Sequence, residues 1–144
     1  MYQITRKNRI KEQLQLCHAD GAPALTIDVD LNVDEIAGRV NKAYEALAMA
    51  QNALQKNTNS PEAMDAYGKA VLAVFNVIFG EKDAAALLAF YEGNYTEMLL
   101  DVFPFINNEI MPKIREASAD RKAQLLAYTK AAAASAKAKP RWRS

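Results

Sequence analysis

The chain has 144 residues, a length that suits one domain with a hydrophobic core and is too short for two. Hydrophobic residues make up 51% of the chain, alanine is abundant, and glycine and proline number only five each, so the composition favours helix. A single cysteine and the lack of an apolar run of about 18 residues exclude a disulfide framework and a membrane span. The basic start, MYQITRKNRIK, is not followed by an apolar segment, which predicts a cytoplasmic protein without a secretion signal.

Charge is segregated along the chain. Residues 1–11 and 121–144 contain eleven of the 18 basic residues and no acidic residue. All 17 acidic residues lie in 12–120 with the other seven bases, which gives that region a formal charge of −10. Such a distribution can steer subunits head to tail or attract a charged partner. The alternative is an ordinary solvated acidic surface with soluble basic ends.

The N-terminal region alternates between apolar and polar residues. Leucines alternate with glutamines before the turn sequence at 19–23, and Leu25, Ile27, Val29 and Leu31 alternate with polar residues after it. A period of two with β-branched residues is typical of strands. The pattern predicts a β-hairpin at roughly 10–18 and 24–31, which must pack on helices or on another subunit because an isolated hairpin is only marginally stable.

From Asn32 onward the apolar residues recur with a helical period. Asn32 and Glu35 form a pattern like a capping box, which predicts a first helix extending to about Lys56. Ser60 followed by Pro61 predicts the start of a second helix. Its wide apolar face indicates a central, mostly buried helix that ends at Gly80 and contains Met64, Tyr67, Val71, Leu72, Val74, Phe75, Ile78 and Phe79.

A short third helix is predicted at about 82–91, ending before Gly93. Asn94 and Glu97 repeat the capping pattern and predict a fourth helix that continues to about Ala117. Pro104 and Pro112 each remove a backbone donor, so this helix should be kinked or split.

A fifth helix is predicted after Ser118, carrying Leu125, Leu126 and Tyr128 ahead of an alanine-rich basic tail that frays from about 135. The predicted fold is therefore mainly α, a bundle of about five helices with a small N-terminal β-hairpin. As one domain overall, it comprises a basic segment and hairpin at 1–31, a helical body at 32–134 and a disordered basic tail at 135–144.

Residue patterns for catalysis or metal binding are incomplete. Cys17 and His18 are adjacent, and neighbouring strand residues point to opposite faces, which disfavours a shared metal or nucleophilic centre. The run DVDLNVD at 28–34 matches the first half of a calcium-binding EF-hand loop, but Val33 replaces the required glycine and Arg39 the required glutamate. Glycines stand singly, which excludes a phosphate-binding glycine loop. We therefore expect a protein that is not an enzyme and has no cofactor.

The segment ALTIDVDLNVDE (24–35) and the segment FNVIFGEKDAAALLAFYEGNYTEMLLDVFPFINNEIMPKI (75–114) carry a family resemblance. Their order resembles the tail assembly chaperones encoded beside the tape measure gene in long-tailed phages and prophages of Gram-positive bacteria. The matching features are a helix that ends in Phe79-Gly80, a short helix, and a further helix with Pro112 and Ile114 late in it. The resemblance covers about residues 24–128.

This resemblance implies a function that involves no catalysis. Such chaperones coat the aggregation-prone tape measure protein and help to recruit tail tube protein, many have a second form made by ribosomal frameshifting, and members tend to self-associate. It implies a homo-oligomer in the host bacterial cytoplasm that is absent from the mature virion. Alternatives are a structural tail or connector component, and, less favoured because the body is acidic, a nucleic-acid-binding regulator that uses the basic ends.

An amphipathic helix of the tape measure protein needs an apolar groove to bind in. We expect that groove where the helix bent at Pro104 meets the second helix, with Tyr91, Tyr95, Phe103 and Phe105 as candidate contacts. The alternative is that all four aromatics belong to the core. The basic tail supplies a second set of candidates for binding an acidic partner, or else is an ordinary solvated end, and consists of Lys137, Lys139, Arg141, Trp142 and Arg143.

Overall fold

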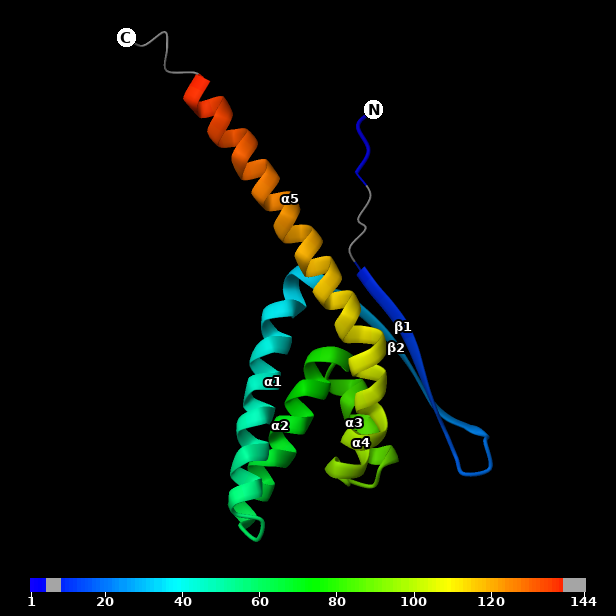
Figure 1. Ribbon diagram of the computed structural model, residues 1–144. Coiled ribbons are helices and arrows are strands. Elements are labelled where there is room, and N and C mark those ends of the chain that lie inside the picture. The colour runs from blue at the N-terminus through cyan, green and yellow to red at the C-terminus, as the bar shows by residue number, and fades with distance from the viewer. Residues whose placement is uncertain (5–8, 139–144) are drawn as a thin grey trace.

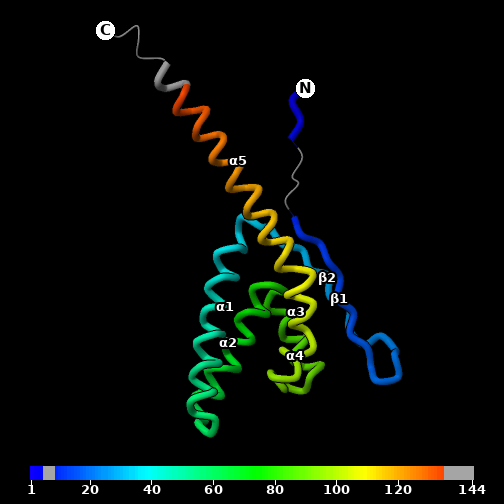
Figure 2. Tube along the Cα trace, in the orientation of Figure 1, coloured from blue at the N-terminus to red at the C-terminus, as the bar shows by residue number. Residues whose placement is uncertain are grey.

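The computed structural model describes residues 1–4 and 9–138. Its elements are a β-hairpin followed by a mainly helical body, as the sequence predicts (Figure 1). The chain trace shows helices α1, α2, α3 and α4 gathered on one side, the hairpin beside them, and the last helix, α5, extending away from the rest (Figure 2). Within the described residues, no helix is both long enough and apolar enough to cross a membrane.

The hairpin pairs β1 (Arg9–Cys17) with β2 (Pro23–Asn32) in an antiparallel register that places Leu14 opposite Ile27. In its turn, the Asp20 carboxylate accepts a hydrogen bond from the Ala22 backbone amide at 2.9 Å. One face of the hairpin is apolar and covers the helices, with buried side chains from Ile10, Leu16, Ile27, Val29 and Leu31. The predicted hairpin is thus confirmed within one residue at each end.

Helices α1 (Val33–Lys56) and α2 (Pro61–Phe79) pack against each other over much of their length. Ser60 caps α2, since its hydroxyl accepts a hydrogen bond from the Ala63 amide at 3.2 Å. The Asn32 cap differs from the predicted pattern, because its side chain bonds the Asp34 amide at 3.1 Å rather than that of Glu35. Helix α2 is central, with a fully buried set formed by Val71, Val74, Phe75 and Ile78.

Met64 is an exception to the predicted buried face of α2, because 59% of it is exposed. It lies in the first turn of the helix, next to the α1–α2 connection, which Figure 1 shows at the end of the helix pair away from the hairpin. Helical periodicity identifies which residues share a face, but it does not show how far the neighbouring elements extend along that face.

Helix α3 (Glu81–Phe90) ends in a tight turn before α4 (Tyr95–Phe105). The Gly93 amide donates to the Leu88 carbonyl at 2.9 Å, and both Glu92 (φ 54°) and Gly93 (φ 81°) have positive φ. This is the left-handed termination that favours glycine after a helix. Helix α4 then begins with the predicted cap, in which the Asn94 side chain accepts from the Glu97 amide at 3.0 Å.

The predicted fourth and fifth helices form one unbroken helical run. After α4 comes a π-helical segment, η1 (Ile106–Ile110), followed directly by α5 (Met111–Ala138). A wider π turn accommodates Pro112, whose ring clashes with the carbonyl four residues earlier in a regular α-helix and which has no amide to donate. The predicted boundary at Ser118 is wrong because residues 113–138 contain neither glycine nor proline and are rich in alanine.

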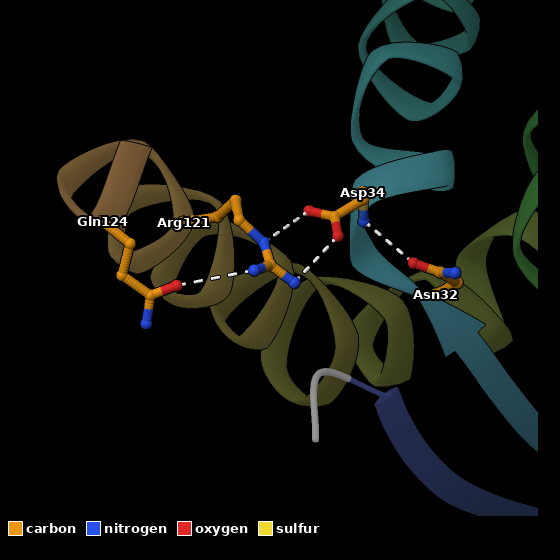
Figure 3. A network of polar contacts seen from close by, with 4 residues as sticks. All are labelled: Asn32, Asp34, Arg121 and Gln124. Carbon is orange, nitrogen blue, oxygen red and sulfur yellow. Dashed lines mark hydrogen bonds and ion pairs between the residues drawn. The ribbon is translucent and has the colours of Figure 1, made fainter. Parts of the chain in front are cut away.

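Among the α5 residues up to 134, those that are buried or half-buried all lie in the first half of the helix. Ile114 is buried, and Arg121 forms a two-pronged ion pair with Asp34 near the start of α1, with both nitrogen–oxygen distances 2.9 Å (Figure 3). Asp34 is itself held by the Asn32 cap described above. Beyond Arg121 every residue up to 134 is exposed.

Candidate partner-binding groove

An apolar groove lies between α1 and α4, and we call it the α1/α4 groove. Its volume is about 420 Å³. It is lined by side chains of two helices, namely Tyr44, Leu47, Ala48 and Gln51 of α1 and Leu99, Leu100, Phe103 and Pro104 of α4. Seven of these eight residues are apolar or aromatic, so the groove suits an apolar ligand surface.

The spacing of the lining residues follows from helix geometry. Residues three and four apart share a helix face, so 44, 47, 48 and 51 form one stripe on α1 and 99, 100, 103 and 104 form another on α4. Leu47 and Leu99 are buried between the helices, whereas 67% of Leu100 is exposed. Ala48 is too small to fill the space opposite, so an opening remains beside Leu100.

Tyr44 occupies one part of the groove wall. Its ring meets Phe103 edge to face, with 6.1 Å between ring centroids and 67° between ring planes. Its hydroxyl is buried and has no hydrogen-bond partner among the described residues. Burial disfavours the charged phenolate and raises the pKa of Tyr44 to about 12, an effect that the positive charge of Arg115 opposes.

The four predicted aromatic contacts are not gathered in one place. Phe103 lines the α1/α4 groove, whereas Phe105 stacks on Phe79 of α2, with 6.4 Å between centroids and 17° between planes. These two residues of α4 therefore contact different helices, Phe103 meeting Tyr44 of α1 and Phe105 meeting Phe79 of α2. The structure places the groove of Phe103 against the first helix, and the predicted location against the second helix is wrong.

The two tyrosines pack elsewhere. Tyr95 lies against α2 at Gly68, where an added Cβ would come within 2.9 Å of the Tyr95 ring. Tyr91 is buried and meets Phe90 edge to face at 5.1 Å between centroids. Burial, and then the nearby negative charge of Asp101, raise the pKa of Tyr91 to about 12. Both tyrosines thus pack within the body, outside the α1/α4 groove.

The basic tail is largely outside the part of the chain that the structure describes. Lys137 lies in the last turn of α5. Lys139, Arg141, Trp142 and Arg143 all lie outside the described residues. Their proposed contact with a partner therefore stays a prediction.

A second, more polar cavity of about 610 Å³ lies where the hairpin turn approaches α3 and α4. Cys17 and His18 both line it, because His18 follows the end of β1 and is no longer constrained by the alternation of strand side chains. The cavity also contains acidic residues, including Glu97 and Asp101. Within residues 1–4 and 9–138, no three histidine, cysteine or acidic side chains are arranged to hold a metal ion.

The α1 wall of the groove and the exposed Leu100 were not predicted from the sequence. A signal for Leu100 was present, since Leu99 and Leu100 are adjacent on a helix and point about 100° apart. A single buried face cannot take both side chains. The contribution of Tyr44, Ala48 and Gln51 depends on which helices meet in the folded chain, and that is not encoded in the local pattern.

Comparisons of this chain with protein-family models, with curated proteins and with solved structures find no match.

Proposed function

We propose that this chain is a non-catalytic phage tail assembly chaperone that binds the tape measure protein and supports assembly of the tail tube. The observation that supports the proposal is the α1/α4 groove, an apolar channel between two helices with an exposed leucine at its rim. Recognition of an amphipathic helix by such a groove is a common mode of protein binding. The family resemblance of residues 24–128 supplies the identity of the partner.

The physical basis of the proposed binding is burial of apolar surface on both partners. A tape measure helix would place side chains spaced three and four residues apart between Leu100 and Ala48, covering both. Leu100 is available for this because most of its surface is exposed, and burying it contributes roughly 1.5–3 kcal/mol before the costs of association. A groove formed by two helices that pack on the same core is also largely preformed, which limits those costs.

Co-expression with a helical tape measure fragment tests the proposal. We expect the fragment to remain soluble with the unaltered chain and to precipitate with Ala48→Trp, which fills the groove, or Leu100→Glu, which charges its rim. Met64→Glu is the matched control, since Met64 is an exposed apolar residue of α2 outside the groove. Precipitation of the fragment to the same extent with and without the chain would show that the proposed function is wrong.

The proposal also places the protein in the host cytoplasm during assembly and outside the finished particle. Quantification of the chain in purified virions separates this role from that of a structural tail or connector component. A chaperone is expected to be absent from the particles, whereas a structural component is retained at a fixed ratio to the tail proteins.

A further inference from the structure

Helix α5 crosses the start of α1 with an open hollow on each side of the crossing (Figure 1). The hairpin-side hollow, about 420 Å³ in volume, is lined by the start of β1 and by α5 residues between 113 and 120. The α1-side hollow, about 350 Å³, is lined by the first turns of α1 and by α5 residues between 118 and 129. Val33 lines both hollows, so α5 rests on this buried side chain with unfilled space to either side.

Opposite charges face each other across both hollows. In the α1-side hollow, Arg121 of α5 is paired with Asp34 of α1 (Figure 3). In the hairpin-side hollow, Glu116 and Asp120 of α5 lie across from Lys11 of β1. Residues 116 and 120 are four apart and share one side of the helix. A movement of α5 toward either hollow is therefore favoured by attraction between opposite charges.

The facing charges of the hairpin-side hollow are not paired in this structure. Among residues 1–4 and 9–138, no ion pair engages Glu116, Asp120 or Lys11. Asp30, which lies opposite Lys11 in the hairpin, is already paired with Arg9 at 2.6 Å. Since Glu116, Asp120 and Lys11 are all exposed, a small movement of α5 can bring them together without first removing a buried charge from water.

The attachment of α5 to the body allows such a movement. Just upstream, the π-helical segment η1 and the proline that follows it interrupt the regular hydrogen bonding, and helices bend at such points. Next to this point, Ile114 is buried and Lys113 pairs with Glu12 of β1, which fixes the lower end of α5. Farther along, the tie between Arg121 and Asp34 is weak, because both side chains are partly exposed.

We propose that α5 is an arm with two positions, one held by the Arg121–Asp34 pair and the other by pairing of Glu116 and Asp120 with Lys11. In the first position, which this structure shows, the arm leans toward α1. In the second position it leans toward the hairpin, so the hairpin-side hollow closes and the α1-side hollow widens. Exposed ion pairs are weak on both sides, so the two positions differ little in free energy and both are populated.

Movement of the arm also changes the width of the α1/α4 groove. Phe103 and Pro104 of the groove lie directly ahead of η1, in the same unbroken helical run as α5. Tyr44, on the α1 wall, meets Phe103 edge to face and is also influenced by the positive charge of Arg115 in α5. The effect of the arm on partner binding rests on the proposed function, whereas its two positions do not.

Two pairs of spin labels measure the arm and the groove separately. Labels at Lys42 of α1 and Ala131 of α5 report the position of the arm, and labels at Asn52 of α1 and Asn107 of η1 report the width of the groove. All four positions are exposed, and a Cys17→Ser background removes the exposed native cysteine. For the arm we expect two distances, of which the shorter, with α5 leaning toward α1, predominates.

Substitutions in the two hollows should shift the arm in opposite directions. Arg121→Gln should raise the ratio of the longer to the shorter arm distance by up to about fivefold, as expected for loss of a partly exposed ion pair. Glu116→Gln with Asp120→Asn should lower the same ratio. Glu45→Gln, which changes an exposed acid of α1 outside both hollows, is the matched control and should leave the ratio unchanged.

Charge reversal supplies a rescue test. Lys11→Glu should abolish the longer arm distance, because it repels the acids of α5. Adding Glu116→Lys and Asp120→Lys should restore that distance, since opposite charges again face each other. Circular dichroism checks that each variant is folded. Absence of the rescue in folded chains would contradict the proposed pairing.

The remaining outcomes separate this inference from the proposed function. A single arm distance in both the unaltered chain and Arg121→Gln, or shifts in the same direction for substitutions in both hollows, would overturn the two positions. An unchanged groove distance in variants whose arm distance shifts would overturn the link to the groove. These measurements need no partner, so loss of fragment solubility in the co-expression test contradicts the proposed function alone.

Discussion

The two halves of α5 belong to one helix but have different reasons to be helical. In the first half, Ile114 is buried against the body and Arg121 is paired with Asp34. In the second half, Leu125 and its neighbours are exposed, and the alanine-rich sequence itself favours helix. Packing against the body therefore determines where α5 lies, and the helix preference of its alanine-rich sequence determines how far the helix continues.

The largest expected difference between the two halves of α5 is in the free energy of unfolding that is lost when an apolar side chain is shortened. Ile114→Ala should lower the free energy of unfolding by about 2–4 kcal/mol, because it leaves a cavity between α5 and the body. Leu125→Ala should change it by no more than about 0.5 kcal/mol, since Leu125 is already exposed in the monomer. Urea unfolding at low protein concentration measures both. Equal effects of the two substitutions would show that the second half is packed as well as the first.

Buried tyrosines of the body should make the stability of the fold depend on pH in the alkaline range. The pKa of Tyr44 is raised to about 12 in the folded chain, above the usual 10, because burial disfavours the phenolate. Its contribution to stability is therefore complete below pH 10 and is lost as the pH rises from 10 to 12, because only the unfolded state ionises readily there. Tyr91 should contribute in the same direction.

Unfolding measured across this pH range checks the prediction. Tyr44→Phe should make the alkaline loss of stability shallower, and it should leave stability at pH 7 unchanged or slightly higher because it removes a buried hydroxyl without a partner among the described residues. Tyr128→Phe, on the exposed half of α5, is the matched control for removal of a tyrosine hydroxyl. An alkaline loss that is unaffected by Tyr44→Phe would assign the effect to other groups.

A smaller effect on the free energy of unfolding is expected at Arg121, near the point where the two halves of α5 meet. Arg121→Ala removes the ion pair with Asp34, and because both side chains are between a third and a half exposed, the loss should be only about 0.2–1 kcal/mol. A double-mutant cycle with Asp34→Ala isolates the pair, and its coupling energy should decline as salt is added. A coupling energy that is independent of salt would argue against an electrostatic origin.

The smallest expected change in global stability comes from glycine in the exposed half. Ala132→Gly should reduce helicity locally, since glycine costs about 1 kcal/mol relative to alanine within a helix. The midpoint of global unfolding should not move, because this end of α5 opens separately from the body. Circular dichroism and amide hydrogen exchange measure the two effects. A shifted midpoint would mean that the second half unfolds together with the body.

The sequence predicted those parts of the fold that local chemistry determines. The hairpin, the Ser60 and Asn94 caps and the helix end at Gly80 follow from side chains and backbone preferences within a few residues. The boundary at Ser118 was predicted from a residue that caps helices but is also tolerated inside them. Only the surrounding alanine-rich sequence and the packing of Ile114 determine that the helix continues.

The candidate site was less predictable than the fold. Phe103 lines a groove, but the opposite wall belongs to α1, more than 50 residues earlier in the chain, and not to the predicted second helix. That wall follows from which helices pack together, and a periodic pattern gives only the apolar face that is available for packing. The binding roles of Phe103, of the other aromatics and of the basic tail remain predictions that the proposed experiments test.

The π-helical segment η1 also affects how α5 is rotated about its own axis relative to α4. It accommodates one residue more than a regular helical turn, and each residue of an α-helix corresponds to a rotation of about 100°. Removing one of its exposed asparagines, such as Asn107, would therefore turn α5 about its own axis relative to α4. Ile114 and Arg121 would then point away from the core and from Asp34. The position of the projecting helix is thus set by a single additional residue upstream of it.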